Sequence, residues 1–218
     1  MFSCWYYYKY SWIKISILNI YRGVIVVSKG EETRNKILKS ALILFSTRGY
    51  EQTSIRDIAR EVNIKAPSIY AYFLSKEELF INVSNFAMKE YTIFVQDHTF
   101  IMEEQSVEKK LYDFIKSLSD YFSENEFGRF INRCFTLPPE QFKEKLVQLY
   151  LESEEEIKKV LLKIISTDAE KFISIDLILA SFFCNLDGML LYRVNYSREH
   201  YEKRLEEIWQ VFWRGIQK

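Results

Sequence analysis

The sequence predicts an all-α fold, and three observations support this. The 218 residues include only six Gly and three Pro, so few positions break a helix and long uninterrupted segments remain. Apolar residues recur at intervals of three and four through most of the chain, which is the period of an amphipathic helix. A hydrophobic fraction of 48%, of which many residues are aromatic, is enough for a packed core and argues against disorder.

Residues 1–28 stand apart in composition. They are crowded with Trp and Tyr and contain basic residues but no acidic one. Lys14 and Arg22 leave only a short apolar stretch between them, too short for a membrane span, and no cleavage site of a secretory signal follows. We expect this leader to be disordered or to reflect a misassigned start, with translation beginning near Val27.

A first ordered helix is expected from Glu31 to Arg48. Glu31 and Glu32 stand where the helix dipole favours negative charge, and Gly49 follows as a C-terminal stop. An apolar stripe at helical spacing marks the face that must cover the next two helices. Its residues are Ile37, Leu38, Ala41, Leu42, Leu44 and Phe45.

Two short helices joined by a tight turn come next. The first is capped by Thr53 or Ser54, and Ser54 with Asp57 resembles a capping box with Asp in place of Glu. It ends at Asn63, one of the few non-glycine residues that tolerate the left-handed conformation of such a turn. The second carries Pro67 in its first turn, where the missing N–H costs nothing.

The second of these helices, expected from Ala66 to Phe73, has an outer side suited to a DNA major groove. Ile69 and Phe73 point inward four residues apart, which leaves small residues, tyrosines and a lysine outside. Small side chains permit close approach, while hydroxyl and ammonium groups reach phosphates and base edges. The outer residues are Lys65, Ala66, Ser68, Tyr70, Ala71 and Tyr72.

A further helix opens with a capping box at Ser75–Glu78. Lys76 lies at its N-terminus, where the dipole prefers an anion, and a phosphate in contact with this helix end would account for a lysine there. The stretch from Lys29 to Lys76 contains nine basic and five acidic residues, whereas the whole chain has a formal net charge of zero. This distribution favours nucleic-acid binding over a solvated hairpin that contacts other proteins, although that alternative stays open.

Three motifs in this stretch match a known pattern. A T-x-x-x-I-A unit occurs as Ser54–Ala59, a Y-x-x-F unit as Tyr70–Phe73 and a K-x-x-L unit as Lys76–Leu79. Together with the preceding helix, which ends in Arg48, Gly49 and Tyr50, they resemble the N-terminal helix-turn-helix of the TetR/AcrR family of bacterial transcriptional regulators. The resemblance covers about a quarter of the chain.

The resemblance also implies roles for single residues. It implies contacts with the DNA backbone from Tyr70, Tyr72 and Lys76, and from Thr53 or Ser54 at the start of the preceding helix. It implies contacts with bases from Lys65, Ala66, Pro67, Ser68 and Ala71, with Arg56 reaching in from the preceding helix. The chain departs from the family pattern at Asn63, where Gly is usual, and at Lys65 and Pro67, which affects the operator sequence that is read.

The composition and the resemblance together predict three segments. They are the leader at residues 1–28, a three-helix helix-turn-helix DNA-binding domain at residues 29–75, and a helical effector-binding and dimerisation domain at residues 76–218, with about nine helices in all. We expect a cytoplasmic, ligand-responsive repressor that binds a palindromic operator in double-stranded DNA as a homodimer. No cofactor, metal or membrane is expected to take part.

The second domain shows further helical patterns. One continues from Lys76 towards His98, and others cover residues 107–122, 127–135 and 142–157. The last carries an acidic stretch at Glu152–Glu156, which we interpret as a solvated face, with a metal site as the alternative.

The last two expected helices suggest how the chain dimerises. The helix at about residues 169–194 is apolar nearly all round, and Asp176, Asn185 and Asp187 argue against a membrane span. The helix from Arg198 to Gly215 carries an apolar stripe that would be exposed without a partner. We therefore predict a four-helix interface between two copies, with Gly188 allowing close approach. Its residues are Phe182, Leu186, Gly188, Leu190, Leu205, Ile208, Trp209 and Phe212.

The family resemblance implies a pocket for a small hydrophobic effector inside the second domain. Aromatic residues at helical spacing usually belong to the core, so packing is the competing interpretation for each candidate. The candidate pocket residues are Phe86, Met102, Phe114, Tyr121, Phe130, Cys134, Phe183 and Met189.

Other kinds of site receive less support. The three cysteines are widely spaced in apolar surroundings, a pattern typical of reduced buried thiols, with a redox sensor at Cys134 or Cys184 as the alternative. His98 and His200 lack the paired spacing of a metal site. No set of nucleophile, base and orienting group is visible, so an enzyme is not expected. A helical small-molecule sensor whose hairpin binds proteins remains the main competing function.

Overall fold

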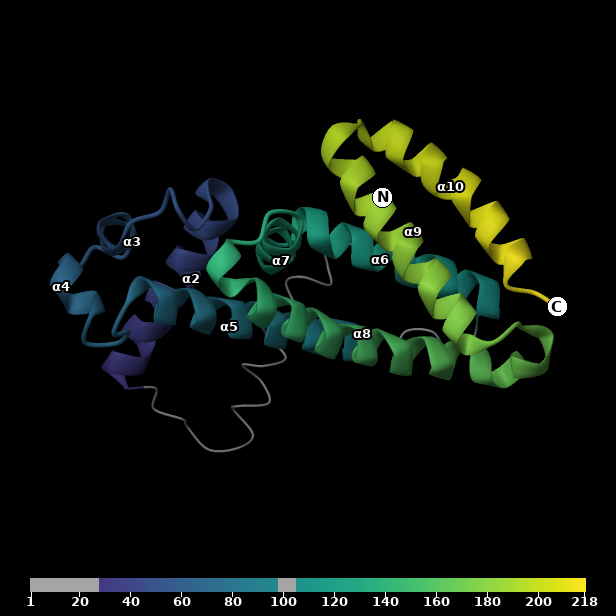
Figure 1. Ribbon diagram of the computed structural model, residues 1–218, viewed down its shortest axis with the longest axis horizontal. Coiled ribbons are helices and arrows are strands. Elements are labelled where there is room, and N and C mark those ends of the chain that lie inside the picture. The colour runs from purple at the N-terminus through teal and green to yellow at the C-terminus, as the bar shows by residue number, and fades with distance from the viewer. Residues whose placement is uncertain (1–27, 98–104) are drawn as a thin grey trace. The chain divides into compact units, whose positions relative to one another are not determined.

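A computed structural model describes residues 28–97 and 105–218 (Figure 1). The expected leader, as well as Met102 and His98, lies outside the described residues. Within them the chain is helical, with nine α-helices and no strand. The helices are α2 (Lys29–Arg48), α3 (Ile55–Glu61), α4 (Ala66–Ile69), α5 (Lys76–Asp97), α6 (Val107–Glu124), α7 (Glu126–Thr136), α8 (Lys143–Ile165), α9 (Ile175–Asn195) and α10 (Arg198–Gly215). The all-α prediction is confirmed.

The chain divides into two units that do not coincide with the expected domains. One unit ends at Lys36, inside α2, and the other runs from Ile37 to Lys218. The second unit shares one continuous hydrophobic core, and no break in packing separates residues before Ser75 from those after it. The boundary at residues 75 and 76 therefore remains a prediction about function.

The turn between α3 and α4 has the expected chemistry. Ser54 caps α3 with a complete capping box to Asp57, and Ile58 and Ala59 form its buried face. Asn63 adopts a positive φ of 55°, which an asparagine tolerates because its short side chain bonds locally. The N–H of Ile64 then donates to the Ala59 carbonyl at 3.0 Å, which fixes the angle between the two helices.

Helix α4 is shorter than the expected span to Phe73. After Ile69 the chain tightens, because the N–H of Tyr70 donates to Pro67 and that of Tyr72 donates to Ile69, three residues back in each case. Ile69 and Phe73 are nevertheless both buried, as their spacing predicted.

Helix α5 begins with a modified capping box. The Ser75 hydroxyl accepts the N–H of Glu78 at 3.1 Å, and the Glu78 carboxylate accepts the N–H of Leu74 at 2.6 Å. Both contacts occupy N–H groups that a helix start leaves free. The helix then runs beside α7 and α8 (Figure 1), and helices α5 to α10 are called the body below.

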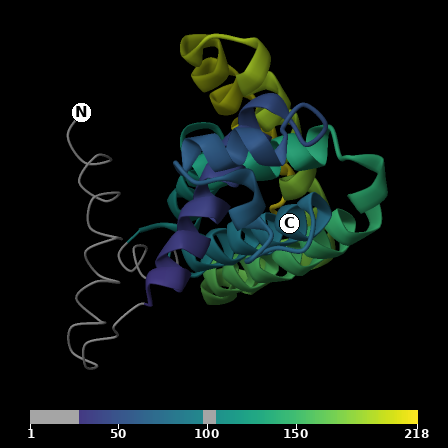
Figure 2. The same ribbon diagram turned by 90° about the vertical axis from the view of Figure 1, so that its left-hand side faces the viewer.

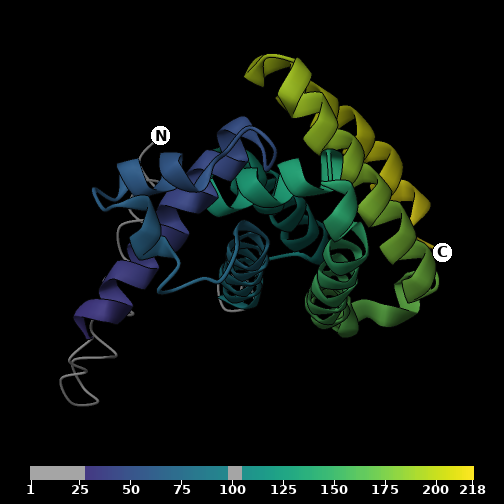
Figure 3. The same cartoon turned by 60° about the vertical axis from the view of Figure 1, so that its left-hand side comes forward.

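Helix α9 begins later than the expected position near residue 169. Residues 166–171 form a short 3₁₀ segment, and Phe172 pairs in an isolated antiparallel bridge with Gln217. The N–H of Ile173 donates to the Ile216 carbonyl at 2.9 Å, so the C-terminal tail holds this stretch extended. Helices α9 and α10 then lie side by side as a pair (Figure 3).

Candidate functional site

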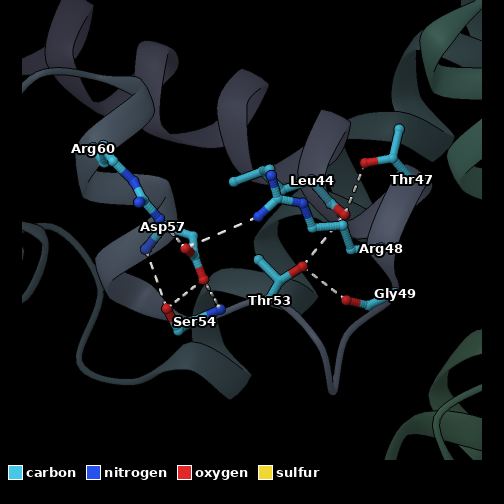
Figure 4. A network of polar contacts seen from close by, with 8 residues as sticks. All are labelled: Leu44, Thr47, Arg48, Gly49, Thr53, Ser54, Asp57 and Arg60. Atoms are coloured by element: carbon cyan, nitrogen blue, oxygen red, sulfur yellow. Dashed lines mark hydrogen bonds and ion pairs between the residues drawn. The ribbon is translucent and has the colours of Figure 1, made fainter.

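The Thr53 side chain connects the start of α3 to the end of α2 by hydrogen bonds. Its side chain is buried, and its hydroxyl oxygen lies 2.8 Å from the Gly49 carbonyl and 3.3 Å from the Leu44 carbonyl (Figure 4). A hydroxyl held between two carbonyls inside the protein does not reach a phosphate. The structure therefore gives Thr53 a supporting position, in contrast to the DNA contact expected at this helix start.

Asp57 is the centre of a polar network at the exposed end of α3 (Figure 4). Its carboxylate accepts the Ser54 hydroxyl at 2.5 Å and the Ser54 N–H at 3.0 Å, and it pairs with Arg60 and, at 3.9 Å, with Arg48. The Ser54 hydroxyl, followed by its N–H and the two guanidinium groups, holds the pKa of Asp57 below its usual range. Both arginine side chains stay at least half exposed, so they leave positive charge at the surface.

The outer side of α3 and α4 presents most of the predicted DNA-contacting residues. Tyr70 is 52% exposed, so both its ring and its hydroxyl are accessible. Figure 2 views the molecule from the side of these two helices. The exposed members of the predicted set are Ser54, Arg56, Lys65, Pro67, Ser68, Tyr70 and Ala71.

Three other predicted contacts are only partly exposed. Ala66 and Tyr72 pack against the hydrophobic core. The ammonium of Lys76 lies 4.0 Å from the centre of the Tyr50 ring, a cation–π geometry. Lys76 thus contacts a ring from the turn after α2 and remains half-buried at the start of α5.

An aromatic cluster joins the helix-turn-helix to the body. Phe80 of α5 contacts four rings, at centroid distances of 5.3 Å from Phe45, 5.0 Å from Tyr50, 5.9 Å from Phe130 and 4.6 Å from Phe142. These rings come from α2 and the turn after it, from α7, and from the segment before α8. A shift of α7 or α5 would therefore change the packing of the rings at the end of α2.

A second contact links α7 to the same place. Arg133 directs its guanidinium to the end of α2, where it lies 3.5 Å from the Thr47 carbonyl. Gly49 has a φ of +88°, and a Cβ at this position would come within 2.8 Å of the Arg133 side chain. The left-handed turn therefore favours glycine here, and a larger residue would also displace the Arg133 guanidinium.

The body contains a cavity of about 360 Å³ between α5, α6, α7, α8 and α9. Its walls are mostly apolar, with a small number of polar groups, as is usual for ligand pockets. The lining residues are Tyr91, Phe122, Ile131, Asn132, Thr136, Val147, Tyr150, Ser153, Ile157, Phe183, Leu186, Asp187, Leu190 and Leu191.

Of the described candidate pocket residues, only Phe183 lines this cavity. Phe114 stacks on Phe182, and Phe130 belongs to the aromatic cluster around Phe80, so both serve the core. Burial also raises the pKa of the Cys134 thiol to about 12, which makes it inert at neutral pH. Phe86, Tyr121 and Met189 likewise lie outside the cavity lining.

Sequence reasoning missed the polar groups of the cavity. Tyr91 and Tyr150 lie within expected helices but are not among the predicted pocket residues, and Asp187 argues there only against a membrane span. The signal that could have identified Asp187 is an acidic residue in the middle of an otherwise apolar helix. Among the described residues, no group of His, Cys, Asp or Glu could hold a metal ion, and the stretch Glu152–Glu156 is no exception.

Most of the predicted dimer residues pack inside the chain itself. Only Gly188, which is exposed, and Ile208, which is partly exposed, remain available to a partner. The residues buried within the chain are Phe182, Leu186, Leu190, Leu205, Trp209 and Phe212.

A different stripe of α9 faces outward. Its members follow one another at intervals of four and three, the spacing of a coiled-coil seam. Leu177 and Leu191 on this stripe are 60% and 59% exposed, and Val211 on α10 is 74% exposed. The stripe consists of Leu177, Ser181, Cys184, Gly188, Leu191 and Asn195, and Ile208, Val211 and Gly215 follow the same spacing on α10.

Helix α9 also has the length and composition of a membrane span between Ile175 and Arg193, where a third of the stretch (33%) is buried. Its partner helices cover one side of it. An apolar helix that is uncovered on one side is expected to pack against a further partner there. The spacing of the outward stripe is that of helices that pack as a coiled coil, so the expected partner is another helix.

The comparisons agree with the geometry of the helix-turn-helix. Residues 37–83 match the model for "Bacterial regulatory proteins, tetR family". The HTH-type transcriptional repressor ComR of Escherichia coli (strain K12) is 36% identical over 110 residues. That match covers 49% of this chain and 52% of ComR, so it spans about half of each protein.

Solved structures match over more of the chain. The TetR-family transcriptional regulator from Cytophaga hutchinsonii has a TM-score of 0.66 at 18% identity, covering 87% of this chain and 97% of its own. The regulator FadR from Bacillus subtilis, solved in complex with stearoyl-CoA, has a TM-score of 0.60 at 15% identity, with 81% and 96% covered. At these identities the similarity establishes the fold alone.

Proposed function

We propose that this chain, which belongs to the TetR family of bacterial regulatory proteins, is a cytoplasmic repressor. It binds a palindromic operator as a homodimer. Binding of a small molecule to the body releases it from the operator. The observation that supports this most strongly is the α3–turn–α4 unit. It is rigidly capped and buried on one side, while Arg56, Lys65 and Tyr70 project from the other side.

DNA recognition would divide between two kinds of contact. Arg48, Arg60 and Lys76 surround the unit with positive charge, which attracts phosphates without regard to sequence. Pro67, Ser68 and Ala71 are small and exposed, so they let α4 approach the base edges closely. Thr53 supports the unit from inside and is left out of the proposed contacts.

Dimerisation would use the outward stripes of α9 and α10. The seam that begins at Leu177 would meet its symmetry copy in a four-helix arrangement, which buries residues that are exposed in one chain. A two-fold dimer reads two half-sites about 34–36 Å apart, which explains why a palindromic operator is proposed.

Helix α7 is the proposed link between ligand and DNA. Ile131, Asn132 and Thr136 line the cavity, while Phe130 and Arg133 on the same helix contact Phe80 and the end of α2. A ligand that prefers one position of α7 would shift the population of the DNA-binding form by its difference in affinity for the two forms.

DNA binding is tested by selecting bound sites from a random DNA pool and measuring affinity with single variants. Lys65→Ala and Tyr70→Ala should each weaken DNA binding about tenfold or more. The salt dependence of the affinity reports the number of ions released on binding, and Lys65→Ala should lower that number by about one. Lys203→Ala, an exposed lysine on α10, is the control. Wild-type affinity in both variants would support the competing function, a hairpin that contacts proteins.

A further inference from the structure

The cavity combines apolar walls with one negative charge. Asp187 on α9 is the sole ionisable carboxylate among the described lining residues, and no lysine, arginine or histidine lines the cavity with it. The deeper wall is aliphatic and aromatic, from Phe122, Ile157 and Leu186 among others. Such a surface suits an apolar body and is unfavourable for an anionic headgroup.

The charged group sits beside aromatic hydroxyls. The Tyr150 hydroxyl lies 3.5 Å from Oδ2 of Asp187, and the buried Tyr91 lines the cavity nearby. A phenol ring presents a negative face that attracts cations, and a carboxylate next to it adds a full charge. The two groups together offer the charge and the aromatic ring that a positively charged centre would contact.

The Asp187 side chain lies at the exposed edge of the cavity, where the neighbouring walls remove part of its hydration. Desolvation by the surrounding walls raises the pKa of Asp187, and a hydrogen bond from Tyr150 partly offsets this. Glu154 lies one turn after Tyr150 on α8. Desolvation raises the pKa of Glu154 as well, and the negative charge of Asp187 raises it further. A cation in the cavity would relieve both effects.

We propose that the cavity binds an amphiphilic organic cation, with its ammonium group between Asp187 and the ring of Tyr150 and its hydrocarbon body against the apolar walls. Its role as the effector rests on the proposed function above, whereas its binding to the cavity does not. The stearoyl-CoA complex of the FadR structure involves an anionic ligand, so this chain would differ from FadR in the charge that it accepts.

The test compares three probes with the same hydrocarbon chain but different headgroups. Binding of dodecyltrimethylammonium, dodecanol and dodecyl sulfate to the full chain is measured by isothermal titration calorimetry below micellar concentrations and without DNA. The cation should bind once per chain and about tenfold or more tightly than the other two, because cation–π and carboxylate contacts add to the same apolar burial. Equal affinity for all three, or tighter binding of the sulfate, would overturn the proposal.

Two variants assign the preference to its residues. Asp187→Asn and Tyr150→Leu should each lose most of the preference for the cation while they still bind dodecanol. Asp176→Asn, an exposed carboxylate at the start of the same helix, should keep it. A preference that survives in both cavity variants would refute the site, and circular dichroism checks that each variant is folded.

Operator binding is then measured separately, with and without the cation. Cation binding by a chain that binds no DNA would overturn the proposed function while it supports the cavity assignment. Release of the operator by the cation in wild type, but not in Asp187→Asn, would support both.

Discussion

The Tyr50 hydroxyl donates a 2.9 Å hydrogen bond to the carboxylate of Glu77, and this bond ties the turn after α2 to the first turn of α5. The Tyr50 ring also contacts Phe80 and Phe142 and lies under the ammonium of Lys76. One side chain therefore joins the helix-turn-helix to α5 and to the segment before α8. Burial, followed by the negative charge and hydrogen bond of Glu77, raises the pKa of Tyr50, so the phenol stays protonated as a donor.

Tyr50→Phe removes this hydrogen bond and keeps the ring. We expect the free energy of unfolding to fall by about 1 kcal/mol, the usual contribution of such a bond. Urea denaturation measures it, with Tyr70→Phe as a control on an exposed ring. Equal loss in the two variants would show that the Tyr50–Glu77 bond contributes nothing of its own.

Gly128 and Gly188 form a matched pair of helix glycines. A Cβ at Gly128 would come within 2.1 Å of the Tyr121 carbonyl oxygen and 2.7 Å of the Phe122 Cα, so α6 and α7 would have to separate. Gly128→Ala should therefore destabilise the chain by about 3 kcal/mol or more. Nothing described lies within 4 Å of a Cβ at Gly188, so Gly188→Ala should stabilise α9 by about 0.5–1 kcal/mol.

Thermal and urea unfolding of the two glycine variants, at a concentration where the chain is monomeric, provide the comparison. A neutral Gly128→Ala would mean that α6 and α7 separate at little cost. At dimeric concentrations Gly188→Leu should lower the association constant, because the side chain would stand on the proposed seam.

Asp57 makes stability depend on pH in a direction that follows from its lowered pKa. Because the folded state holds the pKa below the unfolded value near 3.8, the contribution is complete above that value and is lost as the pH falls through the folded pKa. Asp57→Asn should thus be less stable than wild type at neutral pH and approach it in acid. Urea midpoints between about pH 2.5 and 7 measure this, and a constant difference between the two proteins would contradict it.

The cysteines report on the core and on the proposed seam. Cys134 is buried and Cys184 is exposed, so native protein should react with a maleimide at Cys184, whereas Cys134 should react only after unfolding. Peptide mass spectrometry assigns the modified sites. Labelling of Cys184 should slow as the protein concentration rises into the dimeric range, and a bulky label should favour monomers. A rate that does not change with concentration would place the interface elsewhere.

The amino-acid sequence alone predicts the helical fold and the local geometry of the helix-turn-helix. Helical periodicity, the capping pairs Ser54–Asp57 and Ser75–Glu78, and Asn63 at the turn are short-range signals, because each depends on residues within a few positions of one another. For this reason the structure contains both capping pairs and the turn at Asn63. The exposed outer row of α4 follows from the same local pattern.

Tertiary packing decided what the sequence could not. An apolar residue at helical spacing has the same pattern whether it packs in its own core, against a ligand or against a second copy. The pattern therefore predicts an interface position for Phe182 and Leu186, although both pack within the chain. Thr53 is buried with its hydroxyl on the carbonyls of Leu44 and Gly49, which leaves Ser54 as the exposed member of the pair expected at this helix start. The cavity carboxylate Asp187 and its neighbour Tyr150 lie 37 residues apart in the chain, and only folding brings them together.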